Sequence, residues 1–252
     1  MARYQAILAY DGTDFLGFQR QGKVRTVQSV VEQALRRLNW QGRTILAAGR
    51  TDTGVHASGQ VIAFDLDWDH SPEELGRALN AHLPADAAVQ SVSPAADDFH
   101  PRYDALWRSY RYTVNCAELR NPLLERTTWR IWPAADLQAL QAAARLLPGT
   151  HDFAAFGTPP RVGGSTIRHV YRASWARQAG CLLFEITANA FLYHMVRRLV
   201  FVQMLVGLGR ISLQDLAQGV DAAQPQTPGL AQPQGLVLTQ VGYTAWQDAE
   251  MM

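Results

Sequence analysis

The chain has 252 residues, of which 48% are hydrophobic and 18% are charged, and this composition excludes a disordered or fibrous protein. Its formal net charge is only +1, so a strongly basic body is excluded and any nucleic-acid-binding surface must be a local cleft. Lys23 is the only lysine among the 23 basic residues. Arginine suits phosphate and base recognition, but a genome-wide composition bias would give the same count.

The first half of the chain predicts the order β-α-β-β-α-β. In chain order, the expected elements are a strand over residues 4–10, a helix capped by Thr26, strands over 44–48 and 60–66, a helix from 72 to about 82, and a strand over 89–92. Ser71, Pro72 and Glu74 give the second helix a cap, a proline at its first position and a capping-box glutamate. This order is typical of the split βαβ, ferredoxin-like arrangement.

The second half predicts the same order with no obvious sequence repeat. Its expected elements are a strand over 107–114, a helix over 134–147, strands over 166–175 and 182–187, a long helix over 191–208, and a strand over 236–241. A short helix over 212–218 and a loop over 221–235 are additions. We therefore expect an α+β protein with two ferredoxin-like halves, residues 1–105 and 106–252, mostly antiparallel sheets and a central cleft lined by arginines.

The cysteines and the apolar segments indicate the cellular compartment of the protein. Cys116 and Cys181 form no C-x-x-C pair, so neither a disulfide framework nor a thiolate metal site is expected, and a reducing cytoplasm fits. The apolar run at the N-terminus is too short for a signal peptide. Segment 191–208 carries Arg197 and Arg198 near its middle, which favours a buried amphipathic helix over a membrane span.

One polar stretch, AGRTDTGVHA over residues 48–57, lies between two apolar segments that are expected to be strands. Asp52 is at its centre, in a loop that the strands would hold rigidly. Arg50 would keep that carboxylate ionised through its opposite charge, as a nucleophile or a base requires. Aspartate, threonine and glycine are also ordinary turn formers, so an isolated T-D-T-G string would favour a plain turn.

Other kinds of site have weaker support. No nucleotide-hydrolase, dinucleotide, serine-hydrolase or zincin string is present. His56 follows Asp52 by four residues and could join it as a metal ligand, but no partner cluster is visible and a metal site is not expected. Residues 157–165, GTPPRVGGS, are either a phosphate-binding nest or a mobile loop, and a mobile loop is the simpler interpretation.

Three segments combine arginine with aromatic residues, and RHVYR over 168–172 is the weakest candidate. In WRSYRY, residues 107–112, strand alternation puts Trp107, Ser109 and Arg111 on one face and the other three residues on the opposite face. Tyr110 could thus offer its ring to a base, although a strand tyrosine is usually packed in a core. In NAFLYHMVRR, residues 189–198, an arginine on a buried face would need an anion, and Asp52 is a natural candidate.

Four blocks of sequence together closely resemble the TruA-type tRNA pseudouridine synthases over almost the whole chain. They are YDGTDFLGFQRQ near the start, GRTDTGVHASGQV over 49–61, DDFHPRYDALWRSYRY over 97–112 and ANAFLYHMVRR over 188–198. The resemblance implies two ferredoxin-like halves in one catalytic domain, a homodimer, and neither a metal nor an organic cofactor. It also implies a tRNA substrate modified in the anticodon arm at positions 38 to 40.

The resemblance also implies roles for individual residues. Asp52 would be the catalytic aspartate, acting by attack on ribose C1′, by addition to the uracil ring or by abstraction of a ribose proton. Arg50 would fill the space left by the flipped base, and Tyr110 would stack on the uracil and accept the C5 proton. Arg197 would pair with Asp52, and Leu236 would pack the pocket wall.

Two hypotheses of other classes remain open from the sequence. One is a non-catalytic RNA-binding module, because ferredoxin-like sheets that carry aromatic residues commonly bind RNA. Asp52 discriminates against it, since a carboxylate facing phosphates is unhelpful for binding alone. The other, metal-assisted hydrolysis, predicts that chelation abolishes activity and ranks last.

Overall fold

A computed structural model describes residues 1–221 and 227–246. These residues form two compact units, one of residues 1–106 and 237–245 and one of residues 107–236 with Trp246. The predicted domains, 1–105 and 106–252, stay a prediction. Residues 222–226 of the predicted loop over 221–235 lie outside the described part of the chain.

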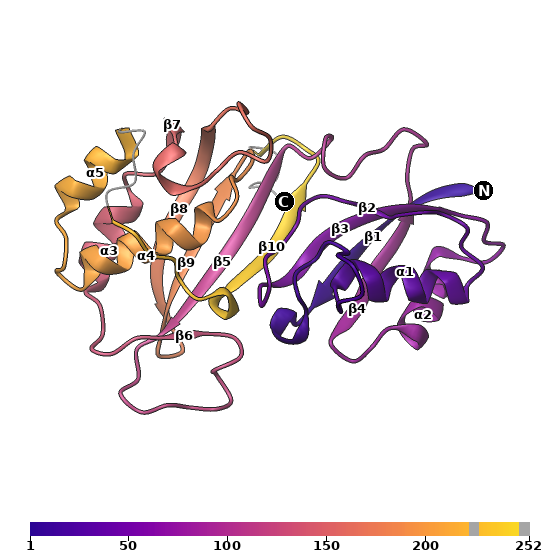
Figure 1. The fold of residues 1–252 in the computed structure, drawn as a ribbon, viewed down its shortest axis with the longest axis horizontal. Helices are drawn as coiled ribbons and strands as arrows, with labels where there is room; N and C mark the ends of the chain where they lie inside the picture. Colours follow the sequence, from indigo (N-terminus) through magenta and orange to yellow (C-terminus); the bar gives the residue numbers. More distant parts are fainter. Residues whose placement is uncertain (222–226, 247–252) are drawn as a thin grey trace. The chain divides into compact units, whose positions relative to one another are not determined.

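The first unit contains a mostly antiparallel sheet (Figure 1). Its elements are β1 (Ala2–Tyr10), the 3-10 turn η1 (Gly12–Asp14), α1 (Val27–Arg37), β2 (Leu46–Ala47), β3 (His56–Leu66), α2 (Pro72–His82), β4 (Ala87–Pro94) and most of β10 (Leu236–Gly242). β1 lies between β4 and β3, and β2 pairs with β3, all antiparallel. β10 pairs in parallel with the start of β3, at His56 and Ala57. The β-α-β-β-α-β order of this part of the chain is confirmed.

The two helices of this unit begin where the sequence predicts. Thr26 Oγ1 accepts a hydrogen bond from the Ser29 N–H (3.2 Å), and Ser29 Oγ accepts one from the Thr26 N–H (3.0 Å). Ser71 and Glu74 form the equivalent reciprocal pair at α2. These bonds satisfy amide groups that a helix leaves without partners in its first turn. Each helix buries one apolar face, and α2 packs on β4.

The second unit is also α+β, so the expected fold class is confirmed. Its elements are β5 (Trp107–Asn115), β6 (Trp129–Arg130), α3 (Leu137–Ala144), β7 (Gly149–Asp152), the 3-10 turn η2 (Ala154–Phe156), β8 (Ile167–Gln178), β9 (Cys181–Ala188), α4 (Met195–Gly207), α5 (Leu213–Asp221) and the 3-10 turn η3 (Pro233–Gly235). The antiparallel order is β5-β9-β8-β7, and β6 pairs in parallel with β5. α3 packs on β8 and α4.

Several predicted boundaries are wrong. The helix expected over 191–208 begins only at Met195, because His194 has a left-handed backbone (φ 65°) and Tyr193 bridges to Thr158 instead of continuing a helix. His56, expected in a loop, is the first residue of β3. Strand β7 was not predicted at all.

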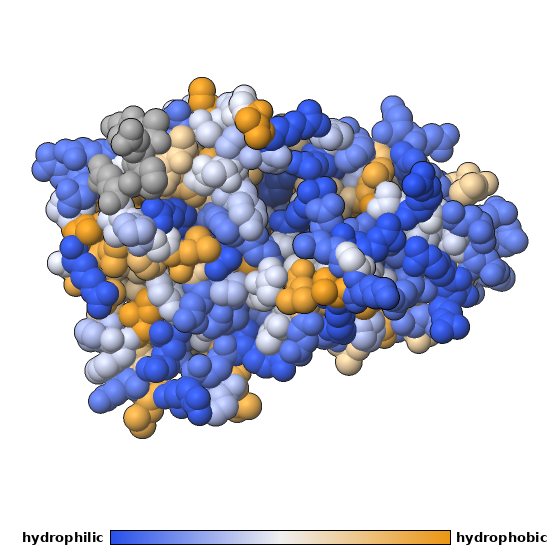
Figure 2. Space-filling model, in the orientation of Figure 1, coloured by the Kyte–Doolittle hydropathy of each residue, from blue (hydrophilic) through white to orange (hydrophobic). Residues whose placement is uncertain are grey.

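Across the described residues, no helix has the length and apolar character needed to cross a bilayer. Figure 2 shows a mostly polar face on which hydrophobic residues are exposed in small separate groups.

Candidate active site

The loop over residues 48–55 lies between β2 and β3, as expected, and carries Asp52 and Arg50. Asp52 is half-buried and Arg50 is exposed. The Val55 N–H donates to the Asp52 carbonyl oxygen (3.1 Å), which closes a turn directly after the aspartate. Gly54 supplies the left-handed backbone (φ 77°) that this turn needs. The loop therefore presents a carboxylate and a guanidinium two residues apart on a fixed backbone.

Segment 10–18 holds the residue that precedes Asp52. The Phe18 N–H donates to the Thr51 carbonyl oxygen (3.0 Å), and the Tyr10 hydroxyl shares a hydrogen bond with Thr51 Oγ1 (2.8 Å). Gly17 has a φ of 82°, and a Cβ built there would lie 3.2 Å from the Thr51 carbonyl oxygen. The loop backbone is thus in close contact with Gly17, and a side chain at this position would press on it.

The start of the loop is held from β3. Gln60 is fully buried, and its Nε2 donates to the Gly49 carbonyl oxygen (3.0 Å). The Ala48 N–H donates to the Val61 carbonyl oxygen (2.9 Å). Arg50 therefore follows an anchored residue, while its own side chain is exposed to solvent.

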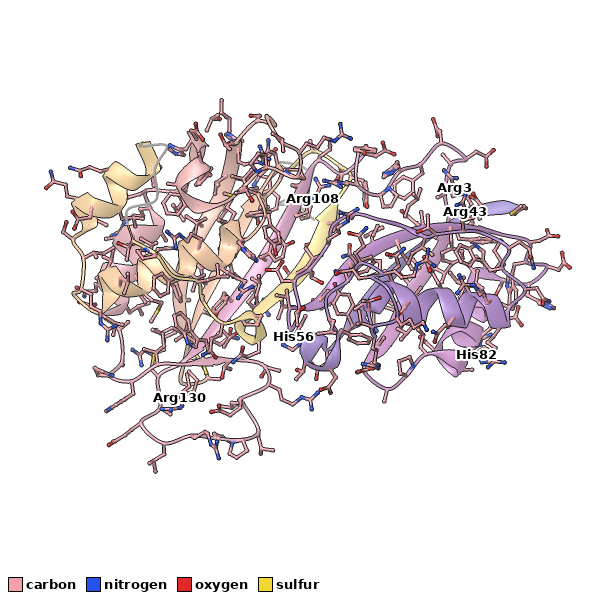
Figure 3. All side chains as sticks on the ribbon, in the orientation of Figure 1. Arg3, Arg43, His56, His82, Arg108 and Arg130 are labelled. Atoms are coloured by element: carbon pink, nitrogen blue, oxygen red, sulfur yellow. The ribbon has the colours of Figure 1, made fainter. Side chains whose placement is uncertain are left out.

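His56 has a structural role next to the loop (Figure 3). Its Nδ1 accepts a hydrogen bond from the Gly12 N–H (3.0 Å) and lies 3.1 Å from Asp11 Oδ1. Within residues 1–221 and 227–246, no three or more His, Cys, Asp or Glu side chains are grouped so that they could hold a metal ion.

In the second unit, β5 has the predicted alternation. Ser109 shares a hydrogen bond with Thr187 (2.7 Å), and Arg111 forms an ion pair with Glu185 (2.9 Å), so both face the same side of the sheet. The half-buried Tyr110 meets Phe191 edge to face at 5.0 Å between ring centroids.

The neighbours of Tyr110 on β5 are also fixed. Arg108, labelled in Figure 3, donates to the Asn189 carbonyl oxygen (3.0 Å). Tyr112 is buried and donates to the Gln232 carbonyl oxygen (2.6 Å), and burial raises its pKa well above the usual value. Tyr112 is therefore a structural donor, whereas Tyr110 is only half-buried.

Two arginines in the first turns of α4 bind backbone carbonyls. Arg197 Nε donates to the Ala231 carbonyl oxygen (2.8 Å), and Arg198 Nη1 donates to that of Gly229 (2.5 Å). Burial lowers the pKa of Arg198. These carbonyls stabilise both cations in a half-buried position. The expected pairing of Arg197 with Asp52 stays a prediction.

Leu236, the first residue of β10, is buried at 6% exposure. Gly235 before it packs against the ring of Tyr112, where a Cβ would lie 2.6 Å from the nearest ring atom. Its expected place in a pocket wall likewise stays a prediction.

Sequence reasoning missed the residues that support the loop. Tyr10 and Gly17 lie in the block YDGTDFLGFQRQ, and Gln60 lies in GRTDTGVHASGQV, so the signal was present but gave no role for any of them. The roles of Gln60 and Gly17 follow only from their contacts with the loop in the folded chain.

A family model and several known proteins match this chain over most of its length. A family model described as "tRNA pseudouridine synthase" matches residues 6–104 and 143–244. A protein of Chloroflexus aurantiacus named "tRNA pseudouridine synthase A" is 42% identical over 245 residues, which cover 94% of this chain and 87% of that protein. Proteins with the same name from Streptococcus equi subsp. equi and Neisseria gonorrhoeae are 38% and 37% identical, over 96% of this chain and 99% and 92% of theirs.

Proposed function

Because the chain belongs to the tRNA pseudouridine synthase family, we propose that it isomerises uridine in the anticodon stem-loop of tRNA, at positions 38, 39 or 40, with Asp52 as the catalytic residue. The family membership makes it an isomerase that forms pseudouridine in tRNA. The observation that carries the role of Asp52 is its half-buried carboxylate on a loop that hydrogen bonds hold on both sides of Arg50.

The reaction explains why a rigid carboxylate is needed. The N1–C1′ bond breaks, the base rotates, C5 bonds to C1′, C5 loses its proton and N1 gains one, so the atoms of the uridine are conserved. Asp52 serves by attack on C1′, by addition to the ring or by removal of a ribose proton, and each route needs a carboxylate held close to one atom of the substrate.

The other candidate residues suit a base that has left its stack. Flipping a nucleotide costs a few kcal/mol. Arg50, exposed beside Asp52, would occupy the space that the base leaves. Tyr110, supported edge-on by Phe191, would stack on the uracil and take the C5 proton. Arg197 would pair with Asp52, and Leu236 would line the pocket.

The wider setting of the enzyme is also proposed. A net charge of +1 with 22 arginines, 23 basic residues less Lys23, suits recognition of RNA by shape and by local phosphate contacts. We propose a cytoplasmic homodimer on the family resemblance. Light scattering at micromolar concentration tests this, and a monomer mass would count against it.

The decisive experiment uses a tRNA transcript with tritium at C5 of uridines 38, 39 and 40. Wild-type protein should release tritium, and Asp52→Asn should release none while it still binds the transcript. Asp69→Asn, which removes an exposed carboxylate between β3 and α2, is the matched control and should retain activity. Release by Asp52→Asn at the wild-type rate would overturn the assignment, and binding without any release by the wild type would favour a non-catalytic RNA-binding module.

A further inference from the structure

The loop that carries Asp52 has an irregular backbone with one turn. Between β2 and β3 no residue over 48–55 is in a strand or helix, and within the loop the Val55 N–H bonds to the Asp52 carbonyl. A short irregular loop of this kind is mobile unless other parts of the chain hold it. The contacts made by Thr51, the residue before Asp52, therefore help to fix the backbone that leads into the carboxylate.

Tyr10 makes one of these contacts from a fixed position. It ends β1 just after a register shift between Leu8 and Tyr10, and such irregularities re-aim a side chain. Its ring packs against Phe15 and Phe18, at 6.5 and 6.3 Å between centroids. Tyr10 is 4% exposed and Thr51 is 7% exposed, so water competes little for the hydrogen bond between their hydroxyls.

We propose that Tyr10 is a positioning residue for catalysis, which holds Asp52 in its reactive geometry through the Thr51 hydroxyl. Thr51 is held at two points, at its carbonyl by the Phe18 N–H and at Oγ1 by Tyr10. Two points of attachment fix both the peptide that leads into Asp52 and the side chain beside it. This inference rests on the proposed catalytic role of Asp52, because a positioning residue matters only if the carboxylate reacts.

The test compares Tyr10→Phe with Tyr4→Phe. Both changes remove one hydroxyl from a buried tyrosine of β1. Tyr4 stacks on Phe64 and pairs with it across the sheet, far along the strand from the loop, so Tyr4→Phe controls for the loss of a hydroxyl from this core. We measure the single-turnover rate of tritium release with saturating enzyme, the Kd for the tRNA transcript, and the Tm of each variant.

Tyr10→Phe should lower the single-turnover rate by about ten- to a hundredfold, as expected for a small displacement of a reacting group, with Kd unchanged. Tyr4→Phe should keep the wild-type rate. Equal rates for the two variants would overturn the proposal. A rate that falls in proportion to the loss of Tm in both variants would also overturn it, because that pattern indicates a purely structural role.

Substitutions at Thr51 give a second, independent test. Thr51→Val keeps the shape of the side chain without the hydroxyl and should reproduce the slow rate of Tyr10→Phe. Thr51→Ser keeps the hydroxyl and should restore most of the rate, while a slow Thr51→Ser together with a fast Thr51→Val would refute the inference. Asp52→Asn separates the two proposals: if it is inactive while Tyr10→Phe is fully active, only the positioning role fails, and if it is active, the catalytic assignment itself fails.

Discussion

Alanine at Gly17 should slow the reaction, whereas alanine at Gly22 should only destabilise the fold. Gly17 has a left-handed backbone (φ 82°), and an added Cβ would lie 3.2 Å from the Thr51 carbonyl oxygen and 3.6 Å from the Asp52 carbonyl carbon. Gly22, in the same segment, is also left-handed (φ 48°), but a Cβ there meets nothing within 4 Å. Gly22→Ala therefore reproduces the backbone strain without the contact, and serves as the matched control.

The backbone strain and the contact with the loop have different consequences. A left-handed backbone costs an alanine roughly 1–2 kcal/mol, and each kcal/mol lowers Tm by about 2–4 °C in a chain of this size, so both variants should melt a few degrees early. Only Gly17→Ala pushes on the loop, because its Cβ at 3.2 Å from the Thr51 carbonyl oxygen is closer than ordinary van der Waals contact, whereas the Gly22 Cβ meets nothing. Since a misplacement of about 1 Å can cost a hundredfold, a shift of a few tenths of an ångström should lower the rate about five- to tenfold.

The assay is single-turnover tritium release at a temperature well below both melting transitions, with tRNA affinity measured in parallel. We expect Gly22→Ala to react at the wild-type rate and Gly17→Ala to react slowly with unchanged affinity. If the two variants react equally fast, the contact between Gly17 and the loop does not control the position of Asp52, and the reasoning is wrong.

Two further predictions concern stability. Arg3 hydrogen-bonds Asp65 and holds the pKa of that carboxyl below its usual value, so the pair stabilises the fold above about pH 4 and loses this effect as the pH falls through the folded-state pKa. Because Asp65 is about half exposed, Asp65→Asn should cost less than about 1 kcal/mol at neutral pH and nothing in strong acid; an equal loss of Tm at both pH values would contradict this. Tyr112→Phe loses the part-buried hydrogen bond to the Gln232 carbonyl and should cost about 1 kcal/mol by urea denaturation, whereas an unchanged midpoint would show that the bond contributes nothing.

Local signals in the sequence were sufficient for some elements. The start of α2 was predicted from Ser71, Pro72 and Glu74, and the structure begins the helix at Pro72, because a capping box acts within four residues. The sequence also predicted the Thr26 cap of α1, which the structure confirms. The loop that carries Asp52 was also predicted, since its polar residues interrupt two apolar segments.

Features that depend on residues far apart in the sequence could not be predicted from local patterns. β3 begins at His56 and not at residue 60, because β10 pairs with His56 and Ala57 from the far end of the sequence. The apolar run before Met195 resembles a helix, yet Tyr193 bonds to Thr158 through backbone groups that no side-chain pattern reveals. The residues that hold the Asp52 loop also lie in other segments of the chain. The sequence therefore predicted the loop but not the residues that hold it.

The pairing of β10 with β3 has a consequence for the order in which the chain folds. The first unit contains residues 237–245 as well as 1–106, and Gly59 of β3 lies so close to Thr239 that a Cβ would fall 2.1 Å from its carbonyl oxygen. During synthesis, domains generally fold from the N-terminus onward, but this unit lacks one strand until residues 237–242 have been made. Until then the edge of β3 at His56 and Ala57, beside the loop that carries Asp52, lacks its β10 partner, and unpaired edges invite association with other chains. Synthesis of β10 therefore both completes the sheet and covers this edge of β3.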